Sequence, residues 1–138
     1  MSGHELALQK ALVARLTADA AVHALVGGRI FDLAPEGAET AHLLIGRGES
    51  RPVAADGCGM EHQVTLTAVS RFRGSEEAKA VLAAVRAALE GAHQEGIGLE
   101  ADGVRTVSLS VRFADVFPAS DGRRVFAVMR IRAVTEEV

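Results

Sequence analysis

The spacing of hydrophobic residues near the start of the chain predicts two helices. Apolar residues between 6 and 16 recur mostly at helical spacing, with polar residues between them, as on an amphipathic helix. Ser2 and Glu5 have the spacing of a capping box that opens this helix. Asp19 is expected to cap a second, shorter helix, which the glycine pair 27–28 ends.

The pattern then changes to strands. Short strands are expected at 29–32 and 42–45, followed by a long loop over 49–60 that contains Pro52 and has no periodicity. Residues 61–72 alternate, which predicts a half-buried strand. One face of that strand carries Val64, Leu66 and Ala68, and the other carries Thr65, Thr67 and Val69.

A third helix and a long hairpin complete the chain. Ser75 is expected to cap a helix with acidic residues in its first turn, and Gly91 is expected to end it. Residues 104–116 and 124–135 alternate, and the turn at 118–122 joins them into an antiparallel hairpin. On the first of these strands, one side is expected to hold Val107, Leu109, Val111 and Phe113, opposite Ser108, Ser110 and Arg112.

The order of expected elements is α-α-β-β-β-α-β-β, and it predicts an α+β fold. Strands that cluster with few helices between them favour an antiparallel or mixed sheet, here of about four to five strands, with the helices on one face. The length of 138 residues and the mass of 14.4 kDa fit one domain over residues 1–138.

Composition excludes several classes of function. The net charge is −3, from 15 Lys and Arg against 18 Asp and Glu, which argues against a dedicated nucleic-acid binder. One cysteine excludes an intramolecular disulfide. The N-terminus has no basic region of a signal peptide, and no apolar run reaches the length of a membrane span. We therefore expect a chain that folds in the cytoplasm and has no membrane partner.

The candidates for chemistry are weak. None of the five histidines forms a zinc-binding pair with another histidine, and Cys58 with His62 lacks two further ligands. Gly46-Arg47-Gly48 follows a strand, but no third glycine opens a helix as a dinucleotide site requires. We expect no catalytic residues, no metal site and no cofactor, and hence a protein that is not an enzyme.

The remaining feature is a mixed sheet face. Arg112, Arg130 and Arg132 share the less apolar face of the two long strands with Phe126. Arginine and aromatic residues together are typical of protein interfaces. A solvated sheet face explains the same pattern equally well at this stage.

Several segments together resemble a known family. They are Leu8–Asp19, Leu25–Asp32, Val69-Ser70-Arg71 with the Gly-Ser-Glu-Glu-Ala-Lys helix start, Phe113-Ala114-Asp115, and Arg130–Glu136. In this order they look like the small tail-completion proteins of siphophage-like particles and prophages, including the gene transfer agents of alphaproteobacteria. The resemblance spans roughly Leu6 to Glu136.

The resemblance implies a tail terminator. Such proteins are α+β domains that form a hexameric ring, cap the tail tube, stop its polymerisation and join it to the head connector. The implied partners are further copies of the chain, the major tail tube protein and the head connector or stopper protein, with DNA passing only through the lumen. Assembly is expected in the bacterial cytoplasm, where the chain becomes a component of the particle.

Interface residues are expected on the mixed face and in the loops 48–60 and 118–124. The candidates are Arg47, Arg51, Arg112, Arg123, Arg124, Phe126, Arg130 and Arg132. Two other functions stay open: an adjacent head–tail neck protein, and a small-molecule-binding or enzymatic α+β domain whose site lies in the Gly-rich loops.

Overall fold

The computed structural model describes residues 3–37, 40–53, 59–71, 74–94 and 99–137. Three helices and six strands follow one another along the chain. Their bounds are α1 His4–Ala18, α2 Ala20–Val26, β1 Ile30–Phe31, β2 His42–Pro52, β3 Gly59–Ser70, α3 Glu76–Gln94, β4 Leu99–Ala101, β5 Val104–Pro118 and β6 Val125–Glu137. The prediction of an α+β fold is confirmed.

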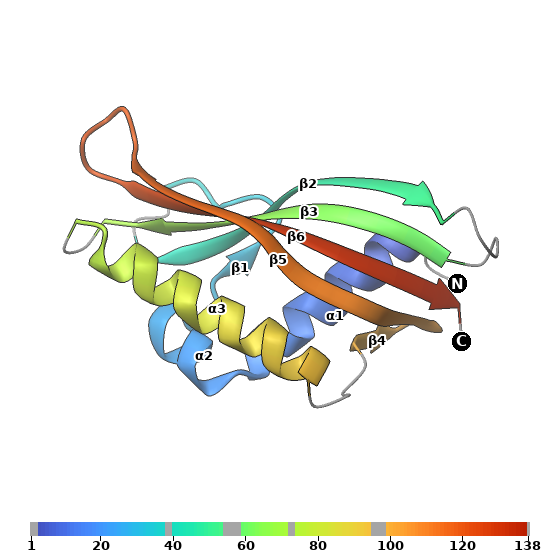
Figure 1. Ribbon diagram of the computed structural model, residues 1–138. Coiled ribbons are helices and arrows are strands. Elements are labelled where there is room, and N and C mark those ends of the chain that lie inside the picture. Colours follow the sequence, from blue (N-terminus) through green and yellow to red (C-terminus); the bar gives the residue numbers. More distant parts are fainter. Residues whose placement is uncertain (1–2, 38–39, 54–58, 72–73, 95–98, 138) are drawn as a thin grey trace.

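One mixed sheet holds all six strands, in the order β1-β2-β3-β6-β5-β4. The pair β1–β2 is parallel and the other pairs are antiparallel. The three helices lie on one face of this curved sheet, and no helix covers the other face within the described residues (Figure 1). The expected number of strands was slightly too low, because β4 has only three residues.

The strand β4 reaches β5 through the tight turn Asp102-Gly103. Ala101 pairs with Val104, so the loop has two residues, and both have positive φ, 52° for Asp102 and 77° for Gly103. Asp-Gly is a favoured pair for such a turn, because both positions require a left-handed backbone. The dipeptide is the sequence signal for β4.

The core lies between the helices and the inner face of the sheet. Along β3 and β6 the buried residues alternate as predicted, since a strand turns every second side chain toward the helices. The fully buried large side chains of the core include Leu12 and Leu16 of α1, Leu89 of α3, Leu66 of β3, and Met129 and Ile131 of β6. This core fixes which face of each strand remains outside.

The helix ends agree with the sequence only in part. Asp19 caps α2 as expected, because its Oδ1 accepts a hydrogen bond from Val22 N–H at 3.0 Å, and Gly27 ends α2 with φ 59°. Helix α1 starts after Gly3, with no side-chain cap bond, and Ser2 lies outside the described residues. The prediction that Gly91 ends α3 is wrong. The helix continues past Gly91 to Gln94, and Gly91 lies beside the Arg15 side chain of α1.

The predicted long loop over 49–60 is also wrong. Strand β2 continues to Pro52 and β3 begins at Gly59, so only the middle of this segment connects the strands. A register shift between Ile45 and Gly48 lets β2 continue past its glycines. The hydrophobic pattern stops there because β2 is exposed from Gly46 to Pro52.

Strand β5 departs from strict alternation at two β-bulges. Register shifts occur between Thr106 and Ser108 and between Val111 and Phe113. Each bulge adds one residue and so reverses the faces of the residues that follow. Leu109 and Val111 point to the core as predicted, whereas Phe113 pairs with Arg130 and is 49% exposed. The predicted grouping of Phe113 with the core face is therefore wrong.

Candidate functional site

The candidate functional site is the sheet face opposite the helices, together with the β5–β6 turn. On the central strands this face is formed by side chains that alternate with the core residues. They are Glu61, Gln63, Thr65 and Thr67 of β3, Phe126, Val128, Arg130 and Arg132 of β6, and Ser108, Ser110, Phe113 and Asp115 of β5. Polar residues occupy one end and apolar residues gather toward the β5–β6 turn.

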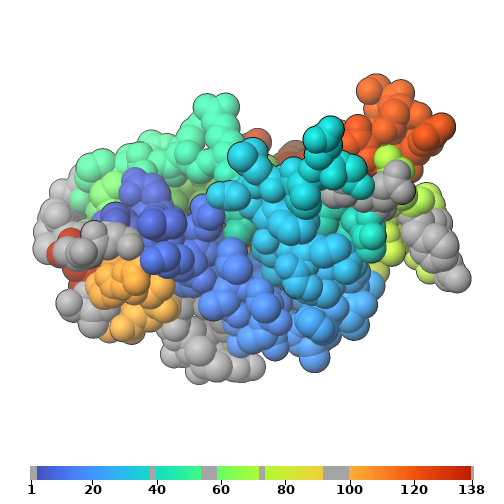
Figure 2. Space-filling view, turned by 180° about the vertical axis from the view of Figure 1, so that it is seen from behind, coloured from blue at the N-terminus to red at the C-terminus, as the bar shows by residue number. Residues whose placement is uncertain are grey.

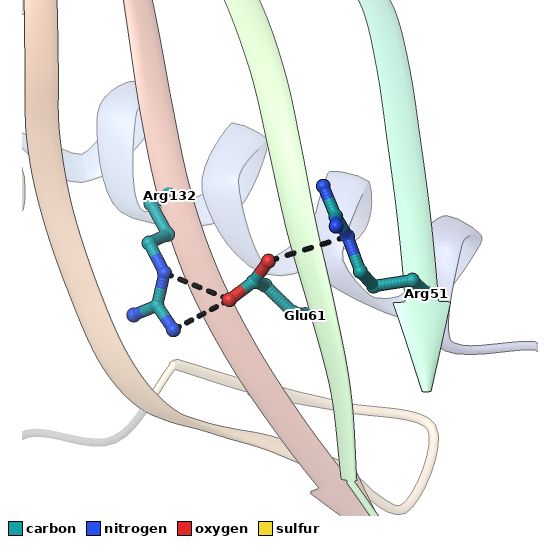
Figure 3. Close-up of polar contacts among 3 residues, drawn as sticks. All are labelled: Arg51, Glu61 and Arg132. Carbon is teal, nitrogen blue, oxygen red and sulfur yellow. Dashed lines mark hydrogen bonds and ion pairs between the residues drawn. The ribbon is translucent and has the colours of Figure 1, made fainter. Parts of the chain in front are cut away.

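Three charged residues link three strands at the polar end. Glu61 of β3 binds Arg132 of β6 through Oε2, at 3.0 Å to Nε and 2.6 Å to NH2, and its Oε1 lies 3.5 Å from Arg51 Nε of β2 (Figure 3). One carboxylate thus serves two guanidinium groups. Ion pairs this exposed add little stability, so their main effect is to fix the direction of the two arginines.

Arg130 lies in the centre of the face, and it has no acidic partner among the residues that the structure describes. Its guanidinium carbon is 5.4 Å from the centroid of the Phe113 ring on β5. Stacking on an aromatic face holds a guanidinium in place and leaves its N–H groups free in the plane. Arg112 is exposed at the neighbouring bulge and lines the same groove as Arg130 and Arg132, with a volume of about 420 Å³.

Arg47 belongs to the same face, at the edge formed by β2. It pairs with Glu49 at 2.6 Å, and both residues line a groove of about 230 Å³ with Arg130. The predicted set Arg47, Arg51, Arg112, Arg130 and Arg132 therefore comes together on one surface. Sequence alternation predicted this for Arg112, Arg130 and Arg132, but not for Arg47 and Arg51 of β2.

The β5–β6 turn projects from the rest of the molecule (Figures 1 and 2). Asp121 organises it: Oδ1 accepts the backbone N–H groups of Arg123 at 2.9 Å and Arg124 at 3.1 Å, and Oδ2 accepts Arg124 Nε at 2.8 Å. These hydrogen bonds hold the pKa of Asp121 well below its usual value, the two backbone bonds contributing most. Arg124 also stacks on Phe126 at 5.4 Å, whereas the Arg123 side chain is exposed.

A polar cluster joins the start of α1 to the sheet, and the sequence analysis missed it. His62 Nε2 lies 2.8 Å and His4 Nδ1 lies 2.7 Å from Thr135 Oγ1, while Glu5 accepts a hydrogen bond from the Ser50 hydroxyl. A hydroxyl donates one hydrogen bond and accepts others, so the Thr135 hydroxyl can bond to both rings. Residues 4 and 135 are too far apart in sequence for any local pattern to reveal the contact.

Most of the chain matches a known protein family. A model of the family described as tail completion protein gp17 matches residues 10–136. The chain belongs to this family. The resemblance inferred from the sequence is thereby confirmed, and with it a structural protein of a phage-like particle.

A solved structure supports the same assignment. The chain is similar to a chain described as "Virion of native gene transfer agent (GTA) particle", with 27% sequence identity, a TM-score of 0.83 and 99% of each chain covered. No curated protein matches the chain. The tail completion fold therefore extends over the whole chain, including the uncovered sheet face.

Three features of the tail completion protein concern the predictions of no metal site, no catalysis and no membrane partner. Among the residues that the structure describes, no three of His, Cys, Asp and Glu gather as a metal site. Cys58, the sequence candidate for a nucleophile or ligand, lies outside the described residues. No helix of the described part is both long and apolar enough to cross a membrane.

The buried His62 predicts a pH dependence of stability. Burial lowers the pKa of His62 below 6.5, and Glu5 opposes this effect only in part. Below pH 6.5 the unfolded chain therefore binds more protons than the folded one, and stability falls as the pH falls. We expect the melting temperature to decrease by roughly 2 to 4 °C between about pH 7 and pH 5.5.

Substitution of His62 distinguishes its contribution to the pH dependence of stability from that of the other titrating groups. His62→Gln keeps a hydrogen-bonding group toward Thr135 and should show a smaller decrease over this pH range in a thermal unfolding assay. The matched control is His23→Gln on an exposed position of α2, which should retain the full decrease. An undiminished decrease in His62→Gln would assign the pH dependence to other groups.

Proposed function

We propose that the chain is a tail terminator, a structural protein without catalysis that caps the tail tube, stops its polymerisation and joins it to the head connector. The observation that carries this proposal, beside the family match, is the presence of two different unpaired strand edges on one small domain. A terminator must bind its own copies in a closed arrangement, and such edges supply the contacts.

The first edge belongs to β2. The strand β1 pairs only with Leu43 and Leu44, so β2 has no neighbouring strand on its far side from Ile45 to Pro52 among the described residues. The second edge belongs to β5, because β4 pairs with Val104, Arg105 and Thr106, and within the described part of the chain no strand pairs with β5 on that side beyond Thr106. Unpaired strands readily add a strand from another chain.

The two edges favour a ring. If the β2 edge of one copy pairs with the β5 edge of the next, the contact is heterologous. Repeating it produces a closed ring when a whole number of copies completes one full turn. The family resemblance implies six copies. Three helices on one sheet face occupy too much space for the inside of a narrow ring, so the uncovered face lines the lumen through which DNA passes.

The β5–β6 turn and the polar ends of β2 and β3 lie at opposite ends of the sheet (Figure 1). They are therefore placed to meet different partners along the axis of the particle. We assign one end to the major tail tube protein and the other to the head connector or stopper protein. Assembly takes place in the bacterial cytoplasm, before the chain becomes part of the particle.

Labelling the chain in whole particles tests this proposal. Gold-labelled antibodies against the purified chain should bind at the head-proximal end of the tail in negatively stained particles whose heads have been detached. The control is a second sample of the same particles, labelled with an antibody against the tube protein in place of the antibody against the chain. Label at the distal tip or along the tube would overturn the proposal.

A further inference from the structure

The central groove of the uncovered sheet face has an unbalanced charge. Arg112, Arg130 and Arg132 line it together with Gln63 and Phe113. Of the three arginines, Arg132 is paired with Glu61, which Arg51 shares. Three cationic groups around one groove repel one another, and an anion bound between them removes that repulsion.

The positive charge is local, because the chain as a whole carries −3. The middle of this face holds five arginines and three acids: Arg47, Arg51, Arg112, Arg130 and Arg132 against Glu49, Glu61 and Asp115. Two of the acids, Glu49 and Glu61, are already engaged by arginines. A basic patch on an acidic protein concentrates anions at one site.

The side chains around the arginines are of types that contact phosphate groups. Thr65 and Gln63 lie beside Arg130 and Arg132 in the pairing of β3 with β6, and Ser110 pairs with Arg132 across β5 and β6. Arginine, serine, threonine and glutamine are among the residues whose side chains form hydrogen bonds with the DNA backbone. The guanidinium group of Arg130, held over Phe113, presents the planar donor geometry that a phosphate accepts.

We propose that the groove lined by Arg112, Arg130 and Arg132 binds the phosphate backbone of double-stranded DNA without reading its sequence. The groove lies on the strands of the sheet, and no helix covers this face within the described residues (Figure 1). Reading a base sequence requires an element inside a DNA groove, so contacts from the sheet surface stop at the backbone. Binding is weak and sensitive to salt, because few phosphates are contacted by one copy.

An acidic peptide is the other polyanion that this charge accommodates. The neutral hydrogen-bond donors on both sides of the arginines favour phosphate, since they continue the contacts along a backbone that has an acceptor at every nucleotide. The proposed ring brings a duplex close to the groove. The binding itself is a property of each copy and is tested on the isolated chain, so its outcome is independent of tail termination.

Fluorescence anisotropy of a labelled duplex of about 20 base pairs, titrated with the purified chain at several salt concentrations, tests the proposal. The double variant Arg112→Ser with Arg130→Ser should bind at least about tenfold more weakly at low salt, and the slope of log K against log salt should fall by about 2. The matched control, Lys79→Ser with Arg86→Ser on α3, removes equal charge from the helical side and should bind like the wild type.

Three outcomes would overturn the proposal. They are binding that the groove variant retains, an equal loss in the α3 control, and displacement of the duplex by polyglutamate of the same charge at the same concentration. The third outcome would assign the groove to an acidic peptide. Circular dichroism of both double variants confirms that each is folded before the titration, and a groove variant that does not fold is replaced by the single substitution Arg112→Ser, with an expected decrease in slope of about 1.

Discussion

Particles that carry Ser50→Pro are expected to lose at least about tenfold in titre, because the substitution blocks the β2 edge through which we propose that copies join. Val53 donates its backbone N–H to Gly59 O at 2.9 Å, so this N–H group points toward β3. Successive residues of an antiparallel strand alternate in this direction, and the N–H of Ser50 therefore points to the open edge. Proline removes that donor without breaking the β2–β3 ladder.

The control is Ser50→Ala. Both substitutions remove the hydrogen bond from the Ser50 hydroxyl to Glu5, but alanine keeps the backbone N–H. Ser50→Ala should thus give nearly normal titre, and the melting temperatures of the two purified variants should be similar. Equal titres for the proline and alanine variants would contradict joining through this edge.

Arg123→Glu is expected to give a comparable loss of titre, with tails and heads that accumulate unjoined. The Arg123 side chain is exposed at the tip of the β5–β6 turn, and only its backbone N–H binds Asp121. Reversing its charge therefore leaves the turn intact, and it introduces repulsion against the acidic partner surface that we propose this turn contacts. Electron microscopy of lysates counts the unjoined heads and tails.

Arg124 is unsuitable for the same experiment. Its guanidinium binds Asp121 and stacks on Phe126, so a glutamate at this position places two carboxylates together and distorts the turn. The matched control for Arg123→Glu is Lys79→Glu, which makes the same change of charge on the exposed side of α3. If both variants join normally, the turn does not carry a charge-dependent contact.

The sequence predicted the fold where the hydrophobic pattern was regular. Strand β6 alternates along its length, and β3 alternates from His62 to Ala68, after which Val69 and Ser70 are buried as well. The prediction failed at the bulges of β2 and β5, because one inserted residue reverses the faces that follow and leaves no mark in composition. It also failed at Gly91, where α3 continues to Gln94.

The candidate surface could be predicted to a similar extent. Alternation along β6 places Phe126, Arg130 and Arg132 on one face, and the structure agrees. The position of Phe113 under Arg130 depends on a bulge, and the link from Glu61 to two arginines depends on the register of three strands. The cluster of His4, His62 and Thr135 joins both ends of the chain, so only the folded structure reveals it.

The length of the tails in particles produced without this chain tests the central claim most directly. A terminator stops the growth of the tube, so its absence should give tails of irregular and excessive length that carry no heads, and expression of the wild-type chain from a plasmid should restore a single length. Tails of normal, uniform length that merely lack heads would contradict termination and favour a neck protein, and normal complete particles would contradict both roles.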